Sequence, residues 1–249
     1  MSPRHIYSSF MLLALAVFVL VRWCIPKPPA LRMLPGWKRV ALALSAFVGG
    51  AVAAKLPFVG TRPADWFDLA TWMQDGKTIV AGLIGAYLAV ELTKFALDIR
   101  VKTGDTFALP LALAMAVGRW GCFFNGCCYG VETALPWGVW FRVKTPDGER
   151  MLKCHPTQIY ESLFHLTMAL VLWQLMRRGL LAGQRLKLYL IAYGVYRFLT
   201  EYIRPEPAWW LGLTFYQWAA AALALGMIAQ WLAERRAAPV AVASARQAL

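Results

Sequence analysis

The stretch that decides the fold reads Gly118-Arg119-Trp120-Gly121-Cys122-Phe123-Phe124-Asn125-Gly126-Cys127-Cys128-Tyr129-Gly130. It follows an apolar run, Leu109 to Val117, which is typical of the inside of a membrane helix. An arginine at the end of such a run is costly in hydrocarbon, so it normally faces a polar cavity or a charged partner. The glycines indicate close approach of the backbone to another helix or to a ligand. The stretch therefore predicts a polar site at the end of a membrane helix.

The composition excludes a soluble protein. The chain has 249 residues, of which 59% are hydrophobic and only 16% are charged, whereas a soluble domain carries about 25% charged residues. The net charge is +13, but the basic residues lie between apolar runs rather than in one polar domain. This pattern indicates contact with anionic lipid headgroups, and it predicts no nucleic-acid partner.

Seven apolar runs predict an all-α membrane protein with seven transmembrane helices in a single integral membrane domain, residues 1–249. Each run has about the length that a bilayer requires. The runs are Tyr7–Val21, Val40–Val59, Thr78–Leu97, Phe107–Phe124, Pro156–Met176, Leu186–Ile203 and Trp209–Leu232.

Residues 131–155 leave the membrane between the fourth and fifth runs. Trp137–Val143 and Arg150–Cys154 flank a turn at Thr145–Gly148, so this loop should contain a small β-hairpin. Residues 233–249 form an Ala-rich basic tail that we expect to be disordered. Lysine and arginine are more frequent at the helix ends on the side of the C-terminus. This bias predicts a cytoplasmic C-terminus, with the N-terminus and the hairpin outside.

Arg197 and Glu201 are four residues apart, so on a helix they share one face. Arg119 adds a second cation inside a predicted span. Two arginines and one carboxylate would give a positive pocket, and guanidinium groups bind phosphate through paired N–H donors. We therefore predict a site for an anionic lipid headgroup, the alternative being a structural ion pair.

The motif His155-Pro-Thr-Gln158-Ile-Tyr160-Glu161 opens the fifth run. Its spacing places His155, Gln158 and Glu161 on adjoining helical faces. The alternative is that His155 caps the helix and Glu161 is solvated. One turn further on, His165 should pack against a polar partner, and Glu91 on the third run should contact another helix.

The five cysteines are Cys24, Cys122, Cys127, Cys128 and Cys154. They lack CxxC…CxxC spacing, so we predict no metal site and no cofactor. Adjacent Cys127 and Cys128 are poor partners for each other, so a disulfide would join one of them to Cys122 or Cys154. The sequence leaves open whether these cysteines are nucleophiles, a disulfide or packing residues.

Together these motifs resemble the signature of the prolipoprotein diacylglyceryl transferase family. The resemblance is carried by Gly118-Arg119, Gly121, Phe123, Asn125-Gly126, Gly130, the motif from His155 to Glu161, Tyr193-Gly-x-x-Arg197-Phe-x-x-Glu201, Arg204-Pro-Glu206 and weakly Gln217. Members of the family move the diacylglyceryl group of phosphatidylglycerol onto a cysteine thiol of a lipoprotein precursor. The resemblance implies phosphatidylglycerol as the lipid partner, and a lipoprotein precursor or a related acceptor as the second partner. It also implies a multi-pass protein of the bacterial plasma (inner) membrane.

The resemblance also assigns roles to residues. It places Arg119 and Arg197 on the headgroup, with Glu201 orienting Arg197. The expected catalytic residues are Arg119, Arg197, Glu201, Cys127 and His155. The expected substrate-binding residues are Asn125, Gly130, Cys122, Gln158, Tyr160 and Arg204.

Three positions depart from the family pattern. Cys122 replaces an asparagine, Cys127 replaces a glutamate, and Val80 replaces a histidine before Ala81-Gly-Leu-Ile-Gly85. The residues expected to bind the phosphate are thus retained, whereas those expected to activate the thiol are changed. His155 is a candidate replacement for the lost base. Two alternatives stay open. One is a lipid transferase with a covalent intermediate on Cys127 or Cys128. The other is a non-catalytic protein, either a redox or metal sensor whose site is Cys122, Cys127, Cys128 and Cys154-His155, or a lipid-binding homologue without activity.

Overall fold

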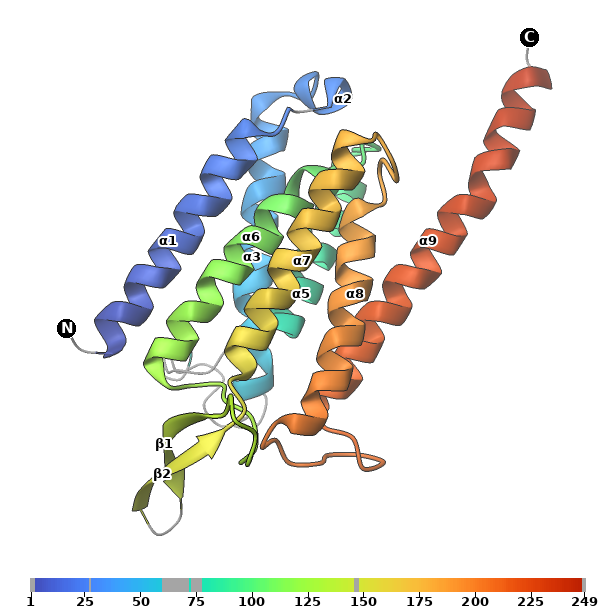
Figure 1. The fold of residues 1–249 in the computed structure, drawn as a ribbon. Helices are drawn as coiled ribbons and strands as arrows, with labels where there is room; N and C mark the ends of the chain where they lie inside the picture. The colour runs from blue at the N-terminus through green and yellow to red at the C-terminus, as the bar shows by residue number, and fades with distance from the viewer. Residues whose placement is uncertain (1–2, 27, 60–71, 73–77, 146–147, 248–249) are drawn as a thin grey trace.

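The computed structural model describes residues 3–26, 28–59, 72, 78–145 and 148–247. The described chain is mostly helical, with one two-stranded antiparallel sheet (Figure 1). The elements are α1 (Pro3–Cys24), α2 (Pro29–Arg32), α3 (Gly36–Val59), α5 (Ile79–Ala96), α6 (Asp105–Asn125), β1 (Val139–Thr145), β2 (Gly148–Cys154), α7 (Thr157–Arg177), α8 (Arg185–Thr200), η2 (Glu201–Ile203) and α9 (Phe215–Gln247).

Among the described residues, five helices are long and apolar enough to cross a membrane, namely α1, α3, α5, α6 and α7. They coincide with the first five predicted runs, which confirms a multi-helix membrane protein. The last two runs form α8 and α9, but these helices do not meet the same criteria, so the count of seven spans stays a prediction. Helix α8 has only 16 residues and is rich in tyrosine and basic side chains.

The predicted hairpin is confirmed. Strands β1 and β2 pair in antiparallel register from Val139 opposite Cys154 to Thr145 opposite Gly148. Helix α9 extends to Gln247, into the segment 233–249 that we expect to be a disordered tail, and that disorder stays a prediction.

The arrangement of the helices brings distant motifs to one end of the bundle. Helix α6 lies between α1 and α7, and α8 packs against α9 (Figure 1). The C-terminal ends of α6 and α8 and the N-terminal end of α7 all lie at the hairpin end. Arg119, Glu161 and Arg197 are therefore brought together, although they are far apart in the sequence.

Helices α3 and α5 form a close pair that depends on glycine. A Cβ atom on Gly85 would overlap the side chain of Ala53 and the carbonyl oxygen of Gly49. Small residues let two helix backbones approach in this way where lipid gives no hydrophobic drive for association. The glycines of the third run are thus explained by helix packing.

Candidate active site

The end of α6 is a Schellman motif. Gly126 adopts a left-handed conformation with φ of 67°, and its N–H donates to the carbonyl oxygen of Phe123 at 3.1 Å. The N–H of Cys127 donates to the carbonyl oxygen of Cys122, also at 3.1 Å. These two bonds end the helix and fold Cys127 back onto its last turn.

Arg119 pairs with Glu161 on α7 through an Nη2–Oε1 hydrogen bond. Both side chains are buried. The Tyr193 hydroxyl donates to the same carboxylate oxygen at 2.7 Å, and His165 Nε2 lies 3.7 Å from it. The expectation that Glu161 is solvated is therefore wrong, because this carboxylate compensates the intramembrane charge of Arg119.

His165 has the polar partner that we predicted, because its Nδ1 lies 2.9 Å from the Tyr189 hydroxyl. Glu161, by contrast, is a central polar group that was absent from the predicted site residues. The signal that could have found it was the need of Arg119 for a carboxylate on a neighbouring helix.

Arg197 and Glu201 form the predicted ion pair, with 2.8 Å between Nη2 and Oε2. Both side chains are buried. Glu201 begins η2, and the Thr214 hydroxyl donates to its other oxygen at 3.3 Å. Glu161 interacts electrostatically with both Arg119 and Arg197. The two pairs therefore form one charged network rather than two separate contacts.

Arg204 brings a third guanidinium group to this network, with its Nε 3.9 Å from Glu201 Oε2. Three guanidinium groups thus lie around two buried carboxylates. Among the described residues, the buried Nε atoms of Arg119 and Arg204 have no hydrogen-bond partner. Glu206 lies next to Arg204, with 3.8 Å between its Oε1 and Arg204 Nη2, and burial raises the pKa of the Glu206 carboxyl above its ordinary value. Buried polar groups are normally hydrogen-bonded, so these two buried Nε donors point to a partner such as an anion.

The loop after α6 is fixed by side chains of α7 and by Arg204. Gln158 Nε2 donates to the carbonyl oxygen of Cys127 at 2.6 Å, and Arg204 Nη1 donates to that of Cys128 at 2.7 Å. Gly130 has no room for a Cβ atom, which would overlap the Ile203 carbonyl oxygen and the His155 side chain. The structure thus gives Gln158, Arg204 and Gly130 a role in shaping the site.

His155 and Tyr160 lie together beside the hairpin. His155 Nδ1 is 3.2 Å from the Tyr160 hydroxyl, which also accepts a 2.9 Å hydrogen bond from Trp137 Nε1. Asn125 is the last residue of α6, and its side chain contacts the Cys127 thiol. These predicted site residues therefore lie at the same end of the bundle as Arg119.

Three of the five cysteines come together. The Sγ atoms of Cys122, Cys127 and Cys128 lie within 4.8 Å of one another, and all three residues are partly exposed. Contacts with the other two thiols hold the pKa of Cys128 well below its ordinary value. All five cysteines are free, so none of the disulfides considered above is formed. The sequence left this clustering open as one alternative, because it depends on the left-handed turn at Gly126.

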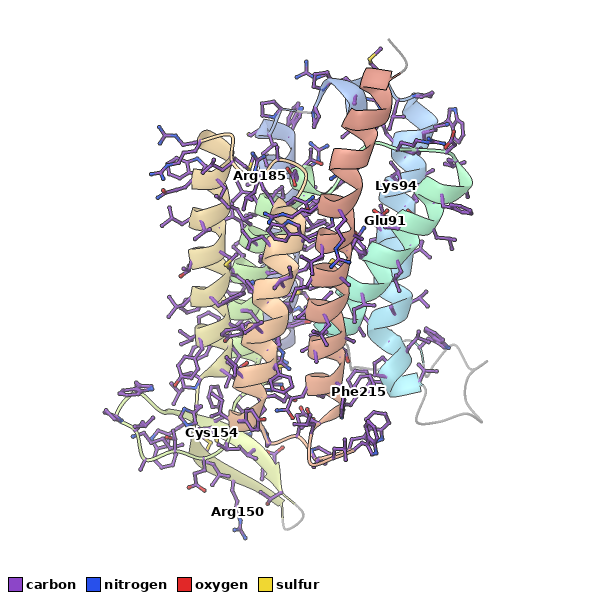
Figure 2. The ribbon with its side chains drawn as sticks, turned by 90° about the vertical axis from the view of Figure 1, so that its right-hand side faces the viewer. Glu91, Lys94, Arg150, Cys154, Arg185 and Phe215 are labelled. Carbon is purple, nitrogen blue, oxygen red and sulfur yellow. The ribbon has the colours of Figure 1, made fainter. Side chains whose placement is uncertain are left out.

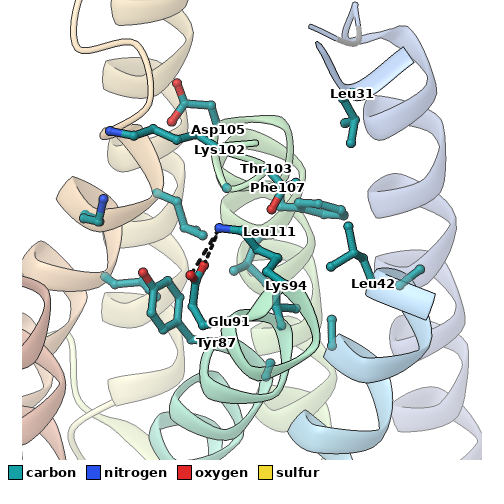
Figure 3. A pocket seen from close by; sticks show the side chains of 18 of the residues that line it. Leu31, Leu42, Tyr87, Glu91, Lys94, Lys102, Thr103, Asp105, Phe107 and Leu111 are labelled. Carbon is teal, nitrogen blue, oxygen red and sulfur yellow. Dashed lines mark hydrogen bonds and ion pairs between the residues drawn. The ribbon is translucent and has the colours of Figure 1, made fainter. Parts of the chain in front are cut away.

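A cavity lies elsewhere in the described part of the molecule. It has a volume of about 580 Å³ and opens at the other end of the bundle, among α1, α3, α5, α6 and α8 (Figure 3). None of the arginines or glutamates of the network described above lines it. Glu91 is at its wall and pairs with Lys94 on the same helix at 2.9 Å, so the contact between helices that we predicted for Glu91 is replaced by one within α5.

A family model described as prolipoprotein diacylglyceryl transferase matches residues 2–233. The chain belongs to this family. A relative from Clostridium tetani named phosphatidylglycerol–prolipoprotein diacylglyceryl transferase is 34% identical over 171 residues, which are 67% of this chain and 68% of the relative. A Streptomyces coelicolor protein of that name, numbered 2, is 35% identical over 72% of this chain and 61% of its own length. A Bordetella parapertussis protein of that name is 32% identical over 78% of this chain and 68% of its own length.

Membership of the prolipoprotein diacylglyceryl transferase family confirms the resemblance found in the motifs. It also favours the transferase interpretation over a covalent-intermediate enzyme or a non-catalytic sensor. The chain departs from the family pattern at Val80, which is buried in the helix core. An apolar group therefore occupies the place of the family histidine.

Proposed function

We propose that this protein transfers the diacylglyceryl group of phosphatidylglycerol to a cysteine thiol of a lipoprotein precursor. The observation that carries the proposal is the buried network of Arg119, Arg197 and Arg204 around Glu161 and Glu201, which retains unpartnered guanidinium donors. A cationic site inside a membrane protein selects an anionic amphiphile, and a guanidinium group matches the geometry of a phosphodiester.

The reaction then follows from the chemistry of the two substrates. The thiol of the precursor loses its proton, and His155 is the candidate base that takes it. The thiolate then attacks the carbon of the diacylglyceryl group that is bonded to the phosphate oxygen. A sulfur–carbon bond forms as the carbon–oxygen bond breaks, and the electron pair leaves with glycerol phosphate. Arg119 and Arg197 stabilise the negative charge on the leaving phosphate. Glu161 and Glu201 hold these two guanidinium groups in place.

We also propose that α8 and α9 complete seven spans. Helix α8 continues directly into η2, and from Arg185 to Ile203 they cover roughly 28 Å, close to the thickness of a bilayer core. The distribution of lysine and arginine supports a cytoplasmic C-terminus, with the N-terminus and the hairpin on the outer face of a bacterial plasma membrane. The active site would then open toward the side on which precursors emerge.

The test is a transfer assay with the purified full chain in vesicles that contain phosphatidylglycerol. The acceptor is a precursor peptide with one cysteine, and its matched control carries serine at that position. We expect a mass increase of the cysteine peptide by one diacylglyceryl group, with release of equimolar glycerol phosphate. Vesicles of phosphatidylethanolamine should give no product. Absence of transfer by folded protein in phosphatidylglycerol vesicles would refute the proposal.

A further inference from the structure

The cluster of Cys122, Cys127 and Cys128 is formed by the local backbone. The two Schellman hydrogen bonds described above bring Cys127 next to Cys122, because they close residues 122–127 into one turn. Cys128 then has a φ of 63°, in the left-handed region that a residue with a side chain rarely adopts. Such a conformation persists only where the surroundings impose it, and it marks sites with a function.

The surroundings of the cluster impose this conformation. The carbonyl oxygen of Cys127 is held by Gln158, and that of Cys128 is held by Arg204 and by the hydroxyl of Thr157. Both backbone positions are therefore fixed by buried or half-buried side chains from other elements. The three sulfur atoms are preorganised at a spacing that one metal ion can bridge.

The electrostatic setting suits a cation bound by thiolates. Three thiolates around a divalent ion carry one net negative charge, and Arg119 Nη1 lies 3.9 Å from Cys122 Sγ to offset it. Thiolate ligands select thiophilic ions such as Zn²⁺. Three protein ligands with a fourth position open are the arrangement of catalytic zinc sites, whereas structural sites use four. Because all three cysteines are partly exposed, a further ligand can reach the ion.

We propose that Cys122, Cys127 and Cys128 bind one Zn²⁺ ion, and that the acceptor cysteine occupies its open fourth position as a thiolate. This role rests on the proposed transferase function. The ion displaces three protons from the site cysteines to water, and the acceptor thiol gives a fourth proton to His155, the candidate acceptor named above, when its sulfur binds the ion. The bound sulfur then forms the bond to the glyceryl carbon while glycerol phosphate leaves, and the ion stays on its three ligands. No oxidation or reduction takes place.

Metal content tests the site without any activity measurement. The full chain, purified with a reducing agent and exposed to zinc, should retain one zinc per chain after gel filtration. Cys122→Ser, Cys127→Ser and Cys128→Ser should each lose it. The matched controls Cys24→Ser and Cys154→Ser should keep it, and unfolding temperatures check that each variant is folded. Zinc content equal in all five variants, or none in the reduced parent protein, would overturn the proposal.

The fourth position is tested with cobalt in place of zinc, since thiolate–cobalt absorption reports each new ligand. Adding the cysteine peptide should change the spectrum, and adding the serine peptide should not. An identical response to both peptides would refute the role of the acceptor thiolate.

The transfer assay distinguishes failure of the zinc proposal from failure of the proposed transferase function. Removal of zinc by a chelator should lower transfer by about 100-fold, in line with the contribution of controlling a nucleophile's protonation state, and added zinc should restore it. Full transfer by metal-free protein would overturn the zinc role and leave the transferase intact. Bound zinc with no transfer under any condition would support the metal site and refute the proposed transferase function.

Discussion

Two clusters of charged side chains lie at opposite ends of the helix bundle, and they differ in cation type and in burial. The hairpin-end cluster contains Arg119, Glu161, Arg197 and Glu201, with side chains no more than 8% exposed. The cavity-end cluster contains Glu91, Lys94, Lys102, Lys187 and Glu234, and several of its side chains are much more exposed, with Lys102 at 53%. Figure 2 shows Glu91 and Lys94 far from Cys154 and Arg150 at the hairpin.

This difference distinguishes ion pairs that position an active site from ion pairs at the surface of the bundle. A buried pair loses its hydration, so removing one partner strands the other at a large cost. A partly exposed pair is screened by water and contributes little. Lysine binds as a point charge, whereas arginine offers a planar set of donors that stays charged when buried. The hairpin-end cluster is thus suited to hold a phosphate, and the cavity-end cluster is suited to the membrane surface.

The largest effect should come from Glu161→Gln, which strands Arg119 in the bundle. We expect a loss of about 3–5 kcal/mol in stability, typical of breaking a buried ion pair, together with the loss of transfer activity. Thermal unfolding in detergent and the transfer assay measure both. Glu91→Gln is the matched control in the cavity-end cluster, and equal destabilisation by the two variants would remove the distinction between the clusters.

The next effect should come from Arg197→Lys, which keeps the charge but removes the planar donors. We expect transfer to fall on the order of 100-fold, as for the loss of a donor to a developing anion, with a much smaller change in unfolding temperature. Arg177→Lys, at a residue stacked on Trp173 at the other end of α7, is the control. Wild-type activity in Arg197→Lys would show that only the charge matters at the hairpin end.

A smaller effect is expected from Gly130→Ala. The added methyl group has to displace the Ile203 carbonyl or the His155 side chain, and overpacking of this kind costs about 1–3 kcal/mol. Activity should fall with stability, because the loop that Arg204 holds would shift. Gly226→Ala is the control, since no atom lies within 4 Å of its added Cβ. Stability unchanged in both variants would contradict the tight packing at Gly130.

The smallest effect is expected from Glu234→Gln. This carboxylate accepts from Lys102 and Lys187, each at 2.6 Å, and its own side chain is 26% exposed. Lys187 is buried, but its Nζ also donates to Gln184 Oε1 at 3.1 Å, so it keeps a partner in the variant. We expect less than about 1 kcal/mol of destabilisation and unchanged transfer. Unfolding measurements at low and high salt check this, because a screened pair loses its small contribution in salt. A large loss of activity would mean that the cavity end takes part in the reaction.

Periodicity and residue type were enough to predict the regular parts of the molecule. Five apolar runs became candidate spans, the hairpin formed where turn residues separated two short strands, and Arg197 met Glu201 because their spacing is local. Each of these features depends on residues that lie near one another in the sequence.

Features that depend on distant residues or on a single backbone torsion were missed or left open. Glu161 meets Arg119 across 42 residues, and helical spacing carries no information on such a contact. The cysteine cluster needs the left-handed conformations of Gly126 and Cys128, whereas the spacing rules for zinc motifs concern other ligand patterns.

The pairing of Arg119 with Glu161 also constrains the biogenesis of the protein. Helix α6 is synthesised before α7, and an uncompensated arginine in a membrane helix costs up to about 2.5–3.5 kcal/mol on the insertion scale, the value for the helix centre. Arg119 lies nearer the end of α6, so its cost is below that limit. Its counter-ion arrives only with the first turns of the following helix. Helices α6 and α7 therefore make a natural insertion unit, in which the second helix neutralises the first as the pair enters the lipid.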